Sequence, residues 1–440
     1  MKRKSYLAGI LLIVGLVRAQ TMPLSMKQAV DLALEPEGST RLQLALEAIE
    51  QAKSRSGQAR AALLPQLDAG VSRDSRTVNL RTFGLEFSTR PGFETIPTFV
   101  GPFSVFDARV NGSQTILNLA AIRRFQSSRV GVHAAEDESD TTRDQVASLV
   151  AKAYLAAIRA DAKLETAQAN IKLAEELLEL AKNQKEAGTG TGIDVTRANV
   201  QLSNERQLLL VAENERTRAY LELLRAMDLR LDTKLQLTDK LEFHPADTMD
   251  PEAALKIALE TRPDWKVQAQ RNKSAELTHS ASKWDRLPSV GAFGNYGTIG
   301  TAIDSNFPTR TYGLSVKVPV FDGGRMDAER AETASMLRQE RIRGADLKMQ
   351  IELETKLAID SLQSARQQVE VAEEGLKLAE DELGHAQRRF TGGVTSSIEV
   401  TDAQNRLARA RDNRIGALFN YESARLDLGY ATGRIRQIVQ

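Results

Sequence analysis

The sequence predicts a mainly α-helical fold with a small β part, built from an internal structural repeat. First, residues 164–228 match residues 369–433 at a constant offset of 205 positions and without a gap. Second, apolar residues recur in steps of three and four over long stretches, as in helices that pack as coiled coils. Third, short segments of alternating polar and apolar residues precede each long helical stretch, as in half-buried strands. We therefore expect one unit of strands and a helical hairpin to occur twice.

The N-terminus has the pattern of a secretory signal peptide. Residues 2–4 are all basic, residues 7–17 are apolar, and Ala19 ends the small-residue pattern that signal peptidase reads. We therefore exclude residues 1–19 from the fold. This apolar stretch is shorter than the about 20 residues that a membrane-spanning helix needs, and no later window is long and apolar enough. Passage through a membrane would have to use strands.

The composition excludes several classes of function. The 440-residue chain has a formal net charge of +1, and its Lys and Arg residues are interleaved with Asp and Glu along helical faces. A nucleic-acid partner is not expected, because a nucleic-acid surface usually needs a basic excess. The chain contains no Cys, which rules out a disulfide framework and a lipidated N-terminal cysteine.

The repeat sets the expected organisation of the chain. Each repeat should contain a helix, two strands and a long helical hairpin. The expected segments are a first repeat at 20–228 with its hairpin at 119–228, a linker at 229–250, a second repeat at 251–433 with its hairpin at 325–433, and a C-terminal tail at 434–440.

The helical hairpins are unusually long. Their outgoing arms, residues 119–185 and 325–390, contain no Pro, so each can run for about 100 Å at 1.5 Å per residue. Ala alternates with larger Leu along the seams, which lets neighbouring helices approach closely. Glu205, Arg216 and Arg414 interrupt the seams of the returning arms. A generic coiled-coil scaffold would show the same seam, so the helices alone leave the function open.

The tips of the two hairpins, residues 188–195 and 392–400, have matching turn signals. Gly188 and Gly393 break the outgoing arms at equivalent positions. After each glycine, a hydroxyl residue is followed three positions later by a carboxylate, which predicts a capping box at the start of each returning helix. The pairs are Thr191 with Asp194 and Ser396 with Glu399. Asp402 lies one turn beyond Glu399 on the same helix face, and capping does not explain this second carboxylate.

Four strands are expected, two in each repeat. The helical pattern stops at Pro65 in the first repeat and at Pro288 in the second, and a pair of strands follows each stop. Within each pair, a polar loop rich in Gly and Pro separates the two strands. The expected strands are residues 66–76, 103–117, 288–297 and 310–321. Four strands cannot close a barrel in lipid, because the smallest common barrels have about 8. Either helices cap a soluble sheet, or several chains contribute strands to one shared barrel.

The mature chain resembles the TolC-type outer-membrane efflux proteins, also called outer membrane factors. The resemblance covers the signal peptide, the doubled unit and the two Gly-tipped turns. Its most specific local match is the segment 318–325, at the expected junction of a strand with a helix, and 287–289 and 393–400 add support. The junction residues that match the family are Pro319, Phe321, Asp322, Gly323 and Gly324. The first repeat lacks both this Pro and this Gly pair, so the two junctions should differ.

The resemblance implies a homotrimer in the bacterial outer membrane with a large periplasmic portion. Four strands from each chain would form one transmembrane β-barrel, and the hairpins would form an α-barrel. Such a channel-tunnel is the passive exit duct of a tripartite efflux or type I secretion system. It is coupled through a periplasmic adaptor to an inner-membrane pump or ABC- or RND-type transporter, and its other partner is outer-membrane lipid. No enzyme activity and no cofactor are implied.

The resemblance also implies roles for residues at the tips. Glu399 and Asp402 match carboxylates that ring the periplasmic entrance, and Asp194 matches a tip carboxylate that pairs with an Arg on the other hairpin in some members. Thr395 stands here in place of that Arg, so Arg388, Arg389 or Arg197 would have to replace it. The residues that resemble adaptor-docking sites are Gly188, Thr191, Ile193, Val195, Gly393, Ser396, Ile398 and Val400. We expect the second hairpin to supply the acidic inner gate.

Other chemistry is not indicated. The four His residues are scattered without the spacing of a metal site, and no Ser-His-Asp arrangement or P-loop can be argued. Two classes of function therefore compete: an efflux or secretion channel, and a periplasmic coiled-coil scaffold or interaction protein without channel activity. The type of cargo does not follow from the sequence.

Overall fold

The structure is a computed structural model that describes residues 22–84, 98–245 and 249–439. The expected signal peptide at residues 1–19 lies outside the described residues. The chain divides into two compact units. The helical unit contains the described parts of Met1–Leu44, Asp140–Pro263 and Met349–Gln440, and the strand unit contains those of Ala45–Ser139 and Asp264–Lys348.

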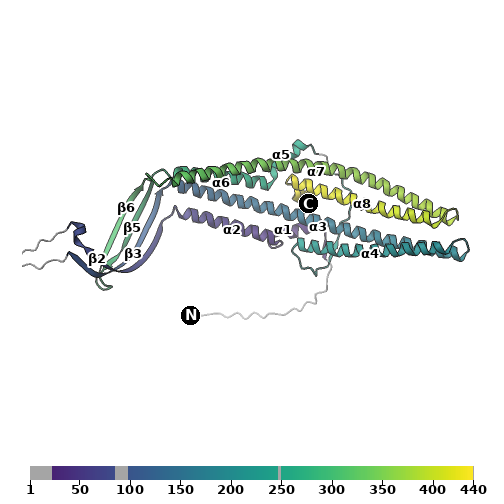
Figure 1. Cartoon of the computed structure of the whole chain (residues 1–440), viewed down its shortest axis with the longest axis horizontal. Coiled ribbons are helices and arrows are strands. Elements are labelled where there is room, and N and C mark those ends of the chain that lie inside the picture. The colour runs from purple at the N-terminus through teal and green to yellow at the C-terminus, as the bar shows by residue number, and fades with distance from the viewer. Residues whose placement is uncertain (1–21, 85–97, 246–248, 440) are drawn as a thin grey trace, which may run out of the picture. The chain divides into compact units, whose positions relative to one another are not determined.

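The order of elements repeats along the chain (Figure 1). The first repeat contains β1 (Met22–Leu24), α1 (Met26–Leu34), α2 (Thr40–Ala61), β2 (Gln66–Asn79), a 3-10 turn (Leu80–Phe83), β3 (Phe99–Leu117), α3 (Leu119–Glu186) and α4 (Gly192–Ala226). The second contains β4 (Leu235–Leu237), α5 (Pro251–Thr261), α6 (Pro263–Trp284), β5 (Ser289–Gly300), β6 (Asn306–Lys317), α7 (Arg325–Thr391), α8 (Ser397–Ala431) and α9 (Ile435–Ile438). The ends of α3 and α7 fall within one residue of the expected outgoing arms.

In the strand unit, β2, β3, β5 and β6 form one antiparallel sheet in that order. The register places apolar side chains together on one face of the sheet. On this face Ala69 lies opposite Val110, and Val110 lies opposite Tyr296. The other face is polar: there Asp68 lies opposite Asn111, whose side-chain amide donates to it at 2.9 Å. Large side chains of the apolar face are exposed in the single chain, among them Leu67, Val71, Tyr296, Tyr312, Leu314 and Val316.

One strand lies earlier than the sequence predicts. The expected strand 310–321 is observed at Asn306–Lys317, and Val318 to Phe321 form no strand. The alternation of Val316, Val318 and Val320 suggested a longer strand. Pro319 has no backbone N–H to donate to a neighbouring strand, so it cannot extend the ladder.

The helical unit has three apolar clusters. The largest surrounds residues 146–160 of α3, where Tyr154 is fully buried and donates from its hydroxyl to the carbonyl of Leu24 at 2.7 Å. Small alanines in this cluster let the helices approach closely. A second cluster lies at the hairpin tips and a third between α7 and α8. No helix among the described residues combines the length and the apolar character needed to span a membrane.

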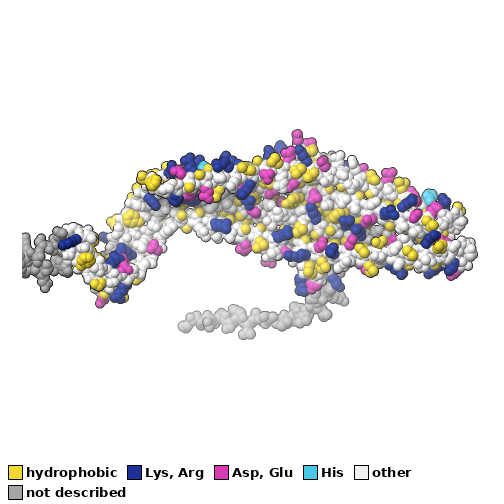
Figure 2. Space-filling view, viewed as in Figure 1, with side chains coloured by type: hydrophobic (Ala, Val, Ile, Leu, Met, Phe, Trp, Pro, Cys, Tyr) yellow, Lys and Arg dark blue, Asp and Glu magenta, His cyan; other side chains and the backbone are white. Residues whose placement is uncertain are grey.

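The expected linker at 229–250 contributes to this unit. Its strand β4 pairs in parallel with β1, which the sequence did not indicate. Further along, the ring of Phe243 lies 4.7 Å from that of Tyr421, whose hydroxyl donates to the carbonyl of His244 at 2.8 Å. Lys and Arg side chains alternate with Asp and Glu over the helices in Figure 2, as their interleaving in the sequence predicts.

The repeat ends at two equivalent residues with left-handed backbone conformations. Asp228 has φ 52° and Gly433, 205 positions later, has φ 66°. The Asp228 carboxylate accepts from the backbone N–H of Thr40 at 2.6 Å and from Arg225 at 2.6 Å. It therefore caps the N-terminus of α2 from a distant part of the chain.

Candidate functional site

The tips of both hairpins share one apolar core. It is formed by the last turns of α3 and α7 and the first turns of α4 and α8, and it contains buried Leu178, Ala181, Ala198, Leu383, Phe390, Val400 and Ala403. The side-chain amide of Gln184 also donates to the carbonyl of Phe390 at 3.2 Å. The two repeats are therefore packed together at their tips.

Each outgoing helix ends at a glycine, as the sequence predicts. Gly188 has φ 76° and Gly393 has φ 70°, a left-handed conformation that residues with a Cβ rarely adopt. The N–H of Gly188 donates to the carbonyl of Lys185 at 3.1 Å, and that of Gly393 to Phe390 at 3.0 Å. The equivalent geometry makes both turns sharp and places Asp194 and Glu399 at the starts of the returning helices.

The first tip centres on Asp194. Its carboxylate accepts from the backbone N–H of Thr191 at 3.2 Å and from the Thr191 hydroxyl. The hydroxyl of Ser397, on the other hairpin, donates to the second carboxylate oxygen. Arg197 lies 3.8 Å away on the same helix. The Ser397 hydroxyl, followed by the Thr191 hydroxyl, lowers the pKa of Asp194, so this carboxylate is charged at neutral pH.

The second tip is built differently. Ser396 occupies the N-cap position of α8 but its side chain makes no capping hydrogen bond, so the expected capping box is not formed there. Instead the hydroxyl of Thr395 donates to Glu399. Arg389 lies 3.5 Å from Glu399, and Asp402, one turn further on, is exposed. The second tip thus carries one partly neutralised carboxylate and one exposed carboxylate.

Three arginines could replace the Arg whose position Thr395 occupies here. Arg389 faces Glu399 and Arg197 faces Asp194, each within its own hairpin. Arg388 lies 3.0 Å from the ring of His385 on its own helix. Ser397 on the other hairpin bonds to Asp194 in place of an arginine, and the sequence analysis did not single this serine out.

The eight residues expected at a docking surface divide into two groups. Ile193 is 59% exposed and Ile398 is 47% exposed, while Val195 and Val400 pack into the tip core. Gly188, Thr191, Gly393 and Ser396 are exposed at the turns. Val394, which the sequence analysis did not name, is 72% exposed beside them. Ile193, Val394 and Ile398 therefore expose apolar side chains at the tips.

The expected strand–helix junction lies at the start of α7. Asp322 accepts from the backbone N–H groups of Gly324 at 3.2 Å and Met326 at 2.9 Å, and so caps this helix. Gly323 and Gly324 have φ values of 70° and 88°. Phe321 is 90% exposed next to Pro319. At the first junction, Asn118 alone caps α3 through the N–H of Ala121 at 2.9 Å, so the two junctions differ as expected.

The described residues contain no group of three or more His, Cys, Asp or Glu side chains that could hold a metal ion. The tip carboxylates are held by hydroxyl, backbone and arginine partners. Their negative charge can attract cations.

Long helical hairpins and a sheet with one exposed apolar face form a fold that solved structures of outer-membrane channel proteins share. The Campylobacter jejuni CmeC outer membrane channel matches with a TM-score of 0.79 at 17% identity, covering 93% of this chain and 86% of that chain. The VceC outer membrane protein of Vibrio cholerae matches with a TM-score of 0.77 at 18% identity, covering 93% and 96%.

The chain belongs to the outer membrane efflux protein family, whose model matches residues 34–228 and 254–434. Among curated relatives, the outer membrane protein TolC of Vibrio cholerae is 24% identical over 349 residues, covering 76% of this chain and 78% of that protein. The alkaline protease secretion protein AprF of Pseudomonas aeruginosa is 21% identical over 438 residues, covering 98% and 88%. These findings confirm the predicted family, fold class and outer-membrane location, and they identify an efflux or secretion channel protein and not an enzyme.

Proposed function

We propose that this protein is the channel-tunnel of a tripartite efflux or type I secretion system, a passive exit duct across periplasm and outer membrane that works as a homotrimer. The observation that carries the proposal is that the first repeat packs against the second within one chain. The equivalent surfaces on the other side of each repeat are left uncovered in the described residues, and further copies of the chain would cover them.

The sheet supplies the first pair of open surfaces. Within the chain, β3 of the first repeat pairs with β5 of the second. Among the described residues, β2 and β6 each pair on one side only. Open strand edges in lipid leave backbone polar groups without partners, which costs several kcal/mol for each group. Pairing of β6 with β2 of the next chain would repeat the β3–β5 relationship, and four strands from each of three chains would close a barrel.

The helices supply the second pair of open surfaces. Within the chain, Lys152 of α3 pairs with Asp427 of α8 at 2.5 Å, which joins the first repeat to the second. The residue 205 positions after Lys152 is Leu357 of α7, and the residue 205 positions before Asp427 is Glu222 of α4. Leu357 is 55% exposed and Glu222 is also exposed. In a closed ring of repeats, α7 of one chain would therefore lie against α4 of the next.

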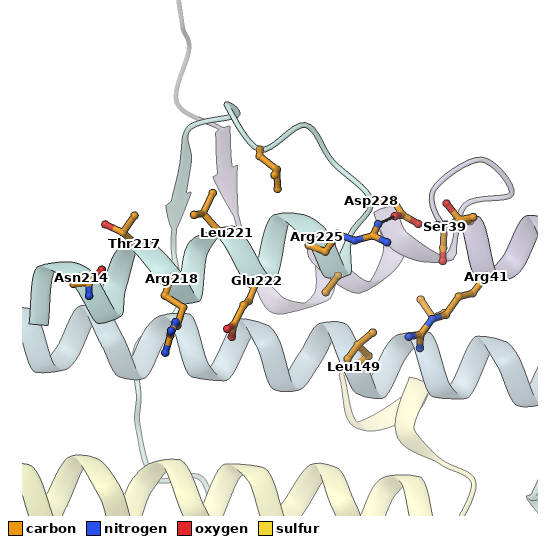
Figure 3. Close-up of a pocket in the computed structure, with 14 residues that line it drawn as sticks. Ser39, Arg41, Leu149, Asn214, Thr217, Arg218, Leu221, Glu222, Arg225 and Asp228 are labelled. Atoms are coloured by element: carbon orange, nitrogen blue, oxygen red, sulfur yellow. Dashed lines mark hydrogen bonds and ion pairs between the residues drawn. The ribbon is translucent and has the colours of Figure 1, made fainter. Parts of the chain in front are cut away.

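Glu222 lines an open groove of about 630 Å³ that is consistent with this contact (Figure 3). Leu149 and Leu221 are 40% and 41% exposed in it, although they are large apolar side chains on long helices. The equivalent of Leu221 in the second repeat, Leu426, is fully buried against α3 within the chain. An exposed leucine in one repeat and a buried one in the other is what an uncovered repeat interface predicts.

The tips would form the periplasmic entrance. Three copies of Glu399 and Asp402 would make a negatively charged constriction that favours cations and responds to divalent ions and pH. The exposed apolar side chains of Ile193, Val394 and Ile398 would bind the periplasmic adaptor, with Val195 and Val400 packing behind them. Relatives are named for alkaline protease secretion and for pyoverdine export, so we infer that cargo choice rests with the inner-membrane pump.

A cysteine cross-link tests the ring directly. The chain has no native Cys, so Glu222→Cys combined with Leu357→Cys provides the only thiols. We expect oxidation to join chains into species of two and three on a denaturing gel. As a matched control, Lys152→Cys with Asp427→Cys should cross-link within one chain and leave it monomeric on the gel. Intermolecular products absent from the first pair, with the control pair oxidised, would overturn the proposed interface.

A further inference from the structure

A buried carboxylate interrupts the coiled-coil seam of the first hairpin. Glu205 on α4 is only 5% exposed. Its equivalent in the second repeat is Ala410, which is partly buried and packs against the tip cluster. An alanine therefore fits this position of the seam, and burying a charged group there costs stability. The repeat itself shows that packing alone does not require Glu205.

Glu205 belongs to a polar layer that joins the two repeats. The side-chain amide of Gln201 donates to Glu205 at 2.8 Å and to Asn405 of α8 at 3.1 Å. Both hydrogens of this amide are then used. Gln201 is itself 8% exposed, so the layer lies inside the bundle. One Glu205 oxygen accepts from Gln201, and the other, Oε2, is buried without a hydrogen-bond partner.

Two further contacts extend the layer to α3. Arg411 of α8 donates to Asn170 at 3.0 Å, and the amide of Gln404 donates to the carbonyl of Leu173 at 3.4 Å. The layer thus connects α3 and α4 of the first hairpin with the returning helix of the second. It lies on the same helices that carry Asp194 and Glu399 at the tips.

The surroundings of Glu205 favour its neutral form. Burial raises the pKa of Glu205, and the amides of Gln201 and Asn170 offset this rise only in part. Glu205 also lines a cavity whose charged groups are Lys163, Glu215, Arg409 and Asp412. Lys163 pairs with Glu215 at 3.2 Å, and none of these groups shifts the pKa of Glu205 to a comparable extent. Ionisation would place a charge on a side chain that is only 5% exposed.

We propose that Glu205, Gln201 and Asn405 form a proton-dependent latch between the two hairpins, closed when Glu205 is protonated. Because the folded pKa is raised, the stabilisation is fully present below the pKa of an unfolded glutamate, about 4.3. It is lost as the pH rises through the folded value. Acidification would hold the tips together, and a rise in pH through the folded value would loosen them. The role of this motion as gating rests on the proposed function, whereas the latch itself is a property of one chain.

Spin labels on one chain measure the latch without any conduction. Ile193→Cys and Ile398→Cys place labels on the two exposed tips of the otherwise Cys-free chain, and excess unlabelled chain isolates the pair within one protomer. We expect the fraction of long inter-label distances to increase between pH 4 and pH 8. Glu205→Gln keeps the shape without the charge and should hold the short distance at both values. Glu205→Ala copies the second repeat and should also lose the pH response.

The control is Glu215→Gln, which removes an exposed carboxylate from the same helix and should leave the pH response unchanged. The latch is overturned if the unmodified chain shows no change with pH, or if Glu205→Gln responds as the unmodified chain does. A chain that shows the pH response but does not conduct in bilayers would support the latch and contradict the proposed duct. The two proposals therefore fail separately.

Discussion

The hydroxyl of Ser397 donates a hydrogen bond to the carboxylate of Asp194 and so joins the tips of two hairpins that come from different repeats. The resemblance to the family implies that in some members an arginine of the other hairpin pairs with this carboxylate. Here Thr395 stands at that position and bonds to Glu399 instead. A neutral hydroxyl therefore makes the inter-hairpin contact, and the available arginines stay within their own hairpins.

Removing this hydroxyl should loosen the tips. A hydrogen bond to a charged group contributes about 1.5–3 kcal/mol, so Ser397→Ala should speed amide exchange in residues 392–400 by about tenfold or more. Hydrogen–deuterium exchange measures the change. Ser396→Ala serves as the control, because the Ser396 side chain makes no capping hydrogen bond. Equal exchange in the two variants would show that the Ser397–Asp194 contact does not hold the tips.

The charge of Asp194 should give the tips a sensitivity to acid. Its pKa is lowered in the folded chain, first by Ser397 and then by Thr191. The stabilisation is therefore present above the pKa of an unfolded aspartate, about 3.9, and is lost as the pH falls through the folded value. Asp194→Asn should be less stable at pH 7 and should lose less stability on acidification. Thermal unfolding followed by circular dichroism compares the two; parallel pH profiles would contradict the assignment.

The two carboxylates of the second tip should differ in their effect on ion block. Arg389 lies 3.5 Å from Glu399, whereas Asp402 is exposed. Asp402→Asn should therefore weaken divalent-cation block more than Glu399→Gln. The double variant Glu399→Ala, Asp402→Ala should raise the blocking concentration about tenfold, which corresponds to about 1.4 kcal/mol. Unchanged block in the double variant would show that these carboxylates do not line the constriction.

Asp228 should be sensitive to substitution for two separate reasons. Its carboxylate caps α2 through Thr40, and its backbone has φ 52°. Asp228→Ala loses a cap contributing about 0.5–2 kcal/mol and keeps a strained backbone. Asp228→Gly copies Gly433, so it loses the cap but relieves the strain and should be about 1 kcal/mol more stable than the alanine variant. Thermal unfolding ranks the variants, and an alanine variant as stable as the glycine variant would remove the strain argument.

The long helices could be predicted closely because their signals are local. Steps of three and four between apolar residues, together with the absence of Pro, fix α3 and α7 to within one residue of their observed ends. Gly188 and Gly393 likewise mark both tips. The strands were found with less precision: Pro319 prevents the ladder from following the valine alternation.

Other features depend on contacts that the sequence does not display. Strand β4 has three residues, too few for a periodic pattern, and forms because β1 is brought beside it. Ser397 reaches Asp194 only once two hairpins separated by 203 positions pack together. Glu205 could be recognised as a break in the seam, but its amide partners lie partly on another repeat.

Copies of this chain should assemble into a conducting duct. Purified full-length protein reconstituted in a planar lipid bilayer tests this assembly by single-channel recording. We expect discrete, cation-selective conductance steps that divalent cations block from one side only, the side of the tip carboxylates. Insertion of folded protein into the bilayer without conductance would contradict it.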